Sequence, residues 1–136
     1  MTSHQVRIIS QTIEVPIEAA YAFAHRPENF QKWAAGLANS LHKTANGWVA
    51  DTPQGQATVR FSEPNAHGVL DHWVNMAGKP EVYIPLRMIA NGSSTEVELV
   101  LFRQAEMSDA DFERDEGLIK QDLATLKKLL EAGESK

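Results

Sequence analysis

The chain has 136 residues, of which 43% are hydrophobic and 23% charged, an ordinary balance for one globular domain. Its formal net charge of −5 argues against binding to nucleic acid or to an anionic membrane surface. The sequence has no cysteine, which excludes disulfides, thiolate catalysis and cysteine-ligated zinc. No stretch approaches the ~20 apolar residues of a membrane-spanning helix, and the N-terminus has no signal-peptide pattern. We therefore expect a soluble, cytoplasmic protein without membrane insertion.

The N-terminal part indicates one strand followed by two short helices. Residues 6–15 are rich in Ile and Val and predict a strand. A proline then opens a helical stretch over 16–25, as proline often does in the first turn of a helix. Pro27 interrupts this stretch, and residues 28–35 predict a second short helix that carries Trp33.

The middle of the chain has the pattern of an antiparallel meander. Turn signals such as Asn46-Gly47 and Asn91-Gly92 recur at spacings of roughly 8–12 residues, with β-rich runs between them. The predicted strands span about 37–44, 47–52, 55–63, 68–76, 81–90 and 95–105.

The C-terminal segment predicts one long helix over 108–130. Ser108 and Asp111 form a start that resembles a capping box, in which each side chain hydrogen-bonds to the backbone of the other residue. Lys127 and Lys128 lie at the end where the helix dipole favours positive charge. The apolar stripe of this helix comprises Phe112, Ile119, Leu123, Leu126 and Leu130.

Alternation of apolar and polar residues assigns one face of each strand to the interior. The inward set is Ala57, Val59, Phe61, Leu70, His72, Val74, Met76, Val82, Ile84, Leu86, Met88, Val97, Leu99 and Leu101. The turns predict three inward cross-strand pairs, namely Val59–His72, His72–Leu86 and Leu86–Leu99.

The same strand registers place four charged residues in line on the outer face: Arg60, Asp71, Arg87 and Glu98. Opposite charges at paired positions stabilise a sheet by a few tenths of a kcal/mol up to about 1 kcal/mol each. We therefore interpret Arg60 and Arg87 as structural residues on a solvated face, and not as residues that clamp a substrate.

Three short stretches and the long helix carry a resemblance to a known family. The stretches are IEVPIEAAYAF over 13–23, PENFQKW over 27–33 and GVLDH over 68–72. With them, the chain resembles the SRPBCC, or helix-grip, superfamily, which includes START domains, birch-pollen-allergen-like proteins and polyketide cyclase/dehydrase-like proteins. The resemblance covers nearly the whole chain.

The resemblance implies a single α+β domain over 1–136 with the helix-grip fold. This fold is a curved seven-stranded antiparallel sheet wrapped around the long C-terminal helix, with two short helices between strands 1 and 2. The resemblance also implies an apolar cavity between sheet and helix, in which members of the superfamily carry lipids, bind hormones or cyclise polyketides. No residue of this chain matches the catalytic positions of the aromatase/cyclase enzymes, so none is assigned.

His72 is the polar residue in an otherwise apolar inward row. Burial disfavours the charged form of a histidine, so His72 would be neutral and could orient a ligand or act as a general base. The structural alternative is a core histidine that is hydrogen-bonded to its surroundings. Asp71 cannot form a dyad with His72, because adjacent residues of a strand point to opposite faces.

Other residues of the predicted cavity are aromatic or apolar, with one polar anchor. Trp33 would lie at the cavity mouth, Trp48 would face inward opposite Val59, and Asn39 has inward parity. The predicted ligand-binding residues are Trp33, Asn39, Trp48, Val59, Phe61, His72, Ile84, Leu86 and Leu99. We expect no cofactor, and no metal because the five histidines have no ligand spacing.

Trp73 and Tyr83 have outward parity, and Phe102 lies across from Tyr83. We call these three residues the outer aromatic strip. The strip is either scattered surface or the interface of a homodimer.

Three functions fit these patterns. The first is a module that binds an apolar or aromatic small molecule, lipid-like or polyketide-like. The second is a polyketide cyclase/dehydratase-like enzyme that uses His72 as general base without a metal or nucleotide cofactor. The third is a non-catalytic interaction protein that dimerises through the outer aromatic strip. Catalysis needs at least two polar groups that converge on one ligand position, whereas a carrier needs one, so the sequence favours the first function.

Overall fold

The computed structural model describes residues 3–34, 40–52 and 55–133. The elements in chain order are β1 (Val6–Ile13), α1 (Ile17–Ala24), α2 (Pro27–Trp33), β2 (His42–Thr44), β3 (Gly47–Thr52), β4 (Gly55–Phe61), β5 (His72–Met76), β6 (Val82–Ile84), β7 (Leu86–Asn91), β8 (Ser94–Phe102) and α4 (Asp109–Glu131).

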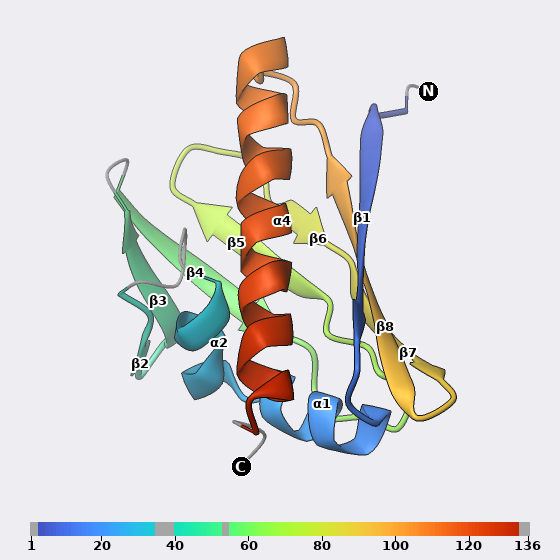
Figure 1. Cartoon of the computed structure of the whole chain (residues 1–136). Helices are drawn as coiled ribbons and strands as arrows, with labels where there is room; N and C mark the ends of the chain where they lie inside the picture. Colours follow the sequence, from blue (N-terminus) through green and yellow to red (C-terminus); the bar gives the residue numbers. More distant parts are fainter. Residues whose placement is uncertain (1–2, 35–39, 53–54, 134–136) are drawn as a thin grey trace.

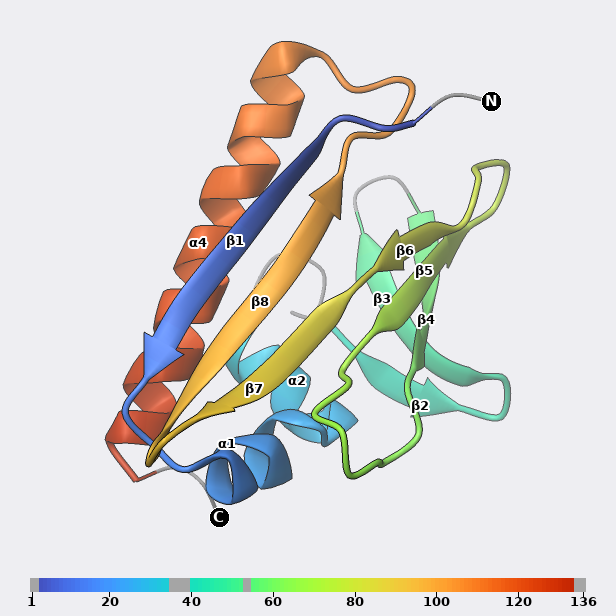
Figure 2. The same cartoon turned by 90° about the vertical axis from the view of Figure 1, so that its right-hand side faces the viewer.

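The strands form two antiparallel sheets that together make one wall behind α4 (Figure 1). One sheet has the order β1-β8-β7 and the other the order β2-β3-β4-β5-β6. The short helices α1 and α2 lie at one end of this wall, where both contact α4 (Figure 2). This is the α+β arrangement expected of a helix-grip fold, with the long C-terminal helix across one face of the strands.

The start of α4 is the one predicted. The Ser108 hydroxyl accepts a hydrogen bond from the Asp111 N–H at 3.1 Å, and the Asp111 carboxylate accepts one from the Ser108 N–H at 3.3 Å. Both hydrogen bonds of the capping box are therefore present. The buried stripe of α4 comprises Phe112, Leu123, Leu126 and Leu130, while Ile119 is only partly buried.

The prediction of one continuous strand over 81–90 is wrong, because the chain is divided at Pro85 into β6 and β7. Proline has no N–H to donate to a neighbouring strand. β6 pairs with β5, whereas β7 pairs with β8. In the described part of the chain, eight strands in two sheets thus replace the single seven-stranded sheet that was predicted.

Backbone hydrogen bonds join the two sheets around the break. The Val100 N–H donates to the Pro85 carbonyl at 3.0 Å, and the Met88 N–H donates to the Gly68 carbonyl at 2.8 Å. Gly68 has a φ of +71°, and an added Cβ would overlap the Met88 carbonyl oxygen, so only glycine allows this close approach. The two sheets therefore form one curved wall, although no strand ladder between the described residues runs across all of it.

Two of the predicted inward pairs are wrong by two residues each. On β4, the residue opposite His72 is Phe61 and not Val59. On the other side of β5, His72 lies opposite Ile84 and not Leu86.

The loop between β4 and β5 explains the first shift. Ser62 donates to the Asp71 carbonyl from both its N–H, at 3.1 Å, and its hydroxyl, at 2.6 Å, which sets the register. A shift of two residues keeps every side chain on the same face, so His72 still points inward. The predicted pair Leu86–Leu99 is confirmed.

The outer charge ladder is only partly confirmed. Arg87 lies opposite Glu98, as predicted. Arg60 lies opposite Trp73 instead of Asp71, and its guanidinium carbon is 4.1 Å from the centroid of the Trp73 ring. Arg60 therefore makes a cation–π contact where an ion pair was expected.

Asp71 does pair with Arg87, but it is buried, with 4% exposure, and not part of a solvated face. Its carboxylate accepts hydrogen bonds from Arg87 Nε and Nη2, both at 2.8 Å. It also accepts from the Tyr83 hydroxyl at 2.6 Å and from the Leu86 N–H at 2.9 Å. Burial by itself would raise the pKa of Asp71, but these hydrogen bonds hold it at about 2, below its ordinary value of 3.8.

We expect Asp71→Asn to lower the free energy of unfolding at pH 7 by about 2–3 kcal/mol, because Arg87 loses its charged partner and an amide N–H group faces the other donors. The lowered pKa stabilises the folded protein above about pH 4, and this contribution disappears as the pH falls toward 2. The difference between wild type and variant in urea unfolding should therefore shrink over that range.

Asp51→Asn is the matched control, because Asp51 is exposed. It should change the free energy of unfolding by less than about 0.5 kcal/mol. A cost for Asp71→Asn no greater than that of the control would contradict the structural role of Asp71.

Candidate ligand-binding cavity

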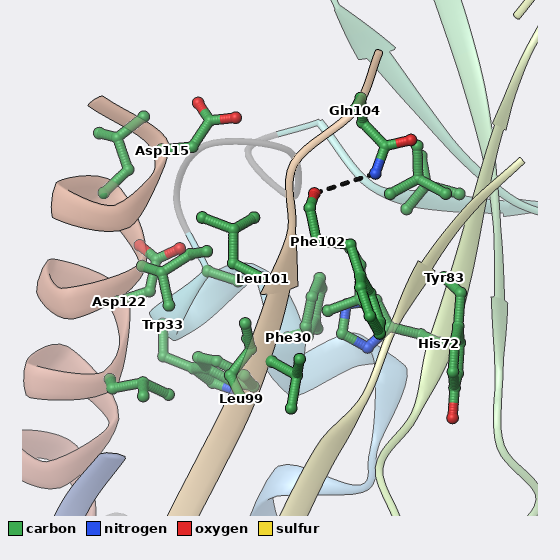
Figure 3. A pocket seen from close by; sticks show the side chains of 18 of the residues that line it. Phe30, Trp33, His72, Tyr83, Leu99, Leu101, Phe102, Gln104, Asp115 and Asp122 are labelled. Atoms are coloured by element: carbon green, nitrogen blue, oxygen red, sulfur yellow. Dashed lines mark hydrogen bonds between the residues drawn. The ribbon is translucent and has the colours of Figure 1, made fainter. Parts of the chain in front are cut away.

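An apolar cavity of about 330 Å³ lies between α4, α2 and strands β5, β6 and β8 (Figure 3). From α4, the lining residues are Asp115, Leu118, Ile119, Asp122 and Leu123. Helical spacing explains this set, since residues four and seven positions after Asp115 lie on the same face of the helix. On this face, Leu123 is buried in the core and Ile119 is partly buried against it, whereas Leu118 is exposed.

The helix α2 supplies the aromatic end of the cavity. Phe30 and Trp33 lie one turn apart on α2, and both are buried and line the cavity. Their rings meet edge to face with centroids 5.0 Å apart. The ring of Phe30 also contacts that of His72 edge to face, at 5.2 Å.

Residues from both faces of the strands line the cavity, which simple alternation does not predict. His72 and Ile84 have inward parity, whereas Tyr83 and Phe102 have outward parity, and all four line it. The reason is that β6 is the edge strand of its sheet and forms no ladder with β8 in the described part of the chain. Side chains next to this gap reach the cavity from either face.

Tyr83 was predicted to point outward, and the structure places it at the boundary between the cavity and the surface. Its side chain is half-buried and donates to Asp71 through the hydroxyl. Its ring stacks on Trp73 at 5.3 Å and on Phe102 at 6.3 Å. The outer aromatic strip therefore exists as a row of stacked rings, and two of its members also border the cavity.

Four of the predicted ligand-binding residues line this cavity: Trp33, His72, Ile84 and Leu99. Leu86 instead borders a small void of about 10 Å³ that Trp33 and His72 also border. Asn39 lies outside the described residues. Whether any of these residues contacts a ligand stays a prediction.

The three remaining predicted residues border a different hollow. Trp48, Val59 and Phe61 line a more polar hollow of about 850 Å³ beside β3 and β4. Phe30, which lines the first cavity, packs its ring against Phe61, which borders the second hollow, with centroids 5.3 Å apart. Alternation predicts which face these residues occupy, but not this contact between α2 and the sheet.

His72 is buried, and its Nδ1 lies 3.1 Å from the Leu70 carbonyl oxygen. A carbonyl oxygen only accepts, so Nδ1 carries the proton, and in the neutral ring Nε2 is an acceptor. Burial lowers the pKa of His72 below its ordinary value of 6.5. His72 is therefore a neutral ring that is hydrogen-bonded to the core on one side and borders the cavity.

Trp33 has a feature that sequence patterns do not reveal. Its side chain is 3% exposed, and its indole Nε1–H has no hydrogen-bond partner among the residues that the structure describes. A buried donor without a partner costs about 1–3 kcal/mol. Such a donor in a cavity wall is a position where a ligand acceptor would stabilise the protein.

Two carboxylates, Asp115 and Asp122, also line the cavity, and both were missed at the sequence level. Their spacing around Ile119 of the apolar stripe was the available signal. Burial raises the pKa of Asp115. Of the cavity-lining residues in the described part of the chain, none is Lys or Arg.

Within residues 3–34, 40–52 and 55–133, no group of three His, Asp or Glu side chains is arranged to hold a metal ion. In the same ranges, no helix combines the length and apolar character needed to cross a membrane.

No protein-family model matches the chain, and no curated protein matches its sequence. Its fold is similar to that of several solved structures. The protein XoxI from Bacillus cereus is 16% identical, with a TM-score of 0.72 over 90% of this chain and 93% of that chain. Ara h 8.0201 is 9% identical, with a TM-score of 0.67 over 95% of this chain and 99% of that chain.

DynU16, described as a protein in the dynemicin biosynthetic locus, is 12% identical, with a TM-score of 0.69 over 94% of this chain and 48% of that chain. These likenesses confirm the predicted helix-grip fold. At such low identities they show the fold alone.

We expect His72→Leu to change how stability depends on pH. The unfolded chain binds a proton at His72 near pH 6.5, whereas the folded protein resists it. Wild type should therefore lose stability as the pH falls below about 6.5, by at most ~1.4 kcal/mol per pH unit, until the folded pKa is reached. His72→Leu has no histidine at this position and therefore lacks this pH-dependent loss of stability.

Urea unfolding of both proteins at pH 7, 6 and 5 measures the effect. The variant should gain stability relative to wild type at each step down in pH. Parallel pH profiles would show that burial does not hold His72 neutral.

Proposed function

We propose that the chain is a binding protein for an apolar small molecule, which it holds in the cavity between α4 and the sheet. The observation that carries this proposal is an apolar cavity of about 330 Å³ lined by Trp33, whose buried indole N–H has no hydrogen-bond partner among the described residues. Small-molecule sites have this character, with mostly apolar walls and a few polar groups that fix orientation.

The volume supports a compact ligand. It lies at the lower end of the ~300–1,000 Å³ typical of small-molecule sites. Burial of apolar ligand surface would contribute roughly 25 cal/mol per Å², from which the cost of association is subtracted. The larger hollow beside β4 is a weaker candidate, because charged side chains such as Arg26, Lys43 and Glu63 border it.

The enzyme alternative has less support. A general base in a cyclase or dehydratase needs a partner that takes up or relays the proton that it accepts. Within the part of the chain that the structure describes, the hydrogen-bond partner of His72 is the Leu70 carbonyl, which supplies no proton relay. A protein that only dimerises needs no open cavity, so the cavity of about 330 Å³ gives this third alternative no support.

The test is a titration of the protein with N-phenyl-1-naphthylamine, a neutral apolar dye that fluoresces when it leaves water. We expect wild type to bind the dye with 1:1 stoichiometry. Ile119→Trp should lower the affinity by at least about 10-fold, because the larger side chain occupies the cavity that Ile119 lines.

Ile89→Trp is the matched control, because Ile89 is half-exposed on β7, away from the cavity-lining set. It should leave the affinity unchanged. Failure of wild type to bind the dye, or equal affinities of wild type and Ile119→Trp, would contradict the proposed function.

A further inference from the structure

Two ring nitrogens of opposite hydrogen-bonding character belong to residues that line the same cavity. Trp33 Nε1–H can only donate, and it has no partner among the described residues. His72 Nε2 is an acceptor, because Nδ1–H is engaged by the Leu70 carbonyl. No hydrogen bond occupies Nε2 within the described ranges.

The two rings lie at the same end of the cavity. Both pack edge to face on Phe30, with centroid distances of 5.0 Å for Trp33 and 5.2 Å for His72. Figure 3 shows Phe30 between Trp33 and His72. Both rings also border the small void of about 10 Å³, which is of the order of the space that one water or hydroxyl group occupies.

The charges on the wall restrict the ligand further. Asp115 and Asp122 are acidic, and no described lining residue is basic. An anionic ligand would lose its hydration without gaining a cationic partner, and it would lie close to two carboxylates. The cavity therefore disfavours carboxylates, fatty acids included.

We propose that the ligand is a neutral molecule with a compact apolar body and one hydroxyl group, which accepts from Trp33 Nε1–H and donates to His72 Nε2. This inference rests on the proposed function. A hydroxyl group both donates and accepts, so it satisfies both nitrogens at once. A carbonyl or an ether would leave His72 without a donor, and an ammonium group would leave Trp33 without an acceptor.

The experiment compares four naphthalene derivatives by calorimetric titration at pH 7. They are 2-naphthol, 2-methoxynaphthalene, 2-naphthoate and protonated naphthalen-2-ylmethylamine, which share the apolar body and differ in the polar group. We expect 2-naphthol to bind about 10-fold more tightly than its methyl ether, since one neutral hydrogen bond gains about this factor. The carboxylate should bind most weakly.

Two variants test the hydrogen bonds of the two rings separately. Trp33→Phe keeps an aromatic ring and removes the donor, and His72→Leu removes the acceptor. His72→Leu should reduce the preference for 2-naphthol over the ether to about 2–3-fold, because the ether cannot donate to this acceptor in the first place. Trp33→Phe should weaken both compounds and keep most of the preference, because both oxygens accept from Nε1–H. Trp48→Phe is the matched control, because Trp48 borders the other hollow, and it should retain the full preference.

Each other outcome overturns the assignment. Equal affinities for the alcohol and the ether in wild type would show that His72 Nε2 is not used, and an unchanged affinity of both in Trp33→Phe would show that Trp33 Nε1–H is not used. Tightest binding of the amine, lost in Asp115→Asn, would assign a cation site instead. Tightest binding of 2-naphthoate would contradict the argument from charge. If the protein binds the neutral dye but does not bind 2-naphthol, the assignment of a hydroxyl ligand is wrong and the proposed function stands. If it binds neither compound, the proposed function is contradicted.

Discussion

The arrangement of the strands depends on the hydrogen bonds that the buried Asp71 carboxylate accepts. This carboxylate accepts the Leu86 N–H directly after Pro85, where the proline interrupts the strand ladder. It also binds Arg87 at the start of β7 and Tyr83 in β6, so one side chain ties both halves of the interrupted strand to the segment before β5. An acid at this depth is stable only because each lone-pair direction meets a donor.

The same break creates the cavity. β6 pairs with β5, whereas β7 pairs with β8, so β6 and β8 belong to different sheets. The cavity lies beside these two strands and under α4. The hydrogen bond to Asp71 fixes the hydroxyl of Tyr83, and the Tyr83 ring stacks on Phe102 beside the cavity. The feature that stabilises the fold thus also places the side chains that border the site.

Patterns within a short stretch of sequence predicted the local structure correctly, whereas contacts between distant segments could not be predicted from them. The capping box at Ser108 depends on residues three positions apart, so the sequence contains all of it. Alternation placed His72 inward even though its strand partners were wrong, because a two-residue shift preserves the face. The contact of Phe30 with Phe61, and the lack of a partner for the Trp33 indole N–H among the described residues, depend on how α2 meets the sheet, which no periodicity encodes.

The central claim is that a small molecule occupies the cavity beside Trp33. A ¹⁵N-labelled sample gives a separate indole N–H signal for each of its three tryptophans, which single Trp→Phe variants assign. On titration with 2-naphthol, we predict that the Trp33 signal moves downfield in a saturable manner as its N–H gains an acceptor, while the signal of Trp73 on the outer aromatic strip does not move. A saturable shift of Trp73 or Trp48 with an unchanged Trp33 signal would contradict this account.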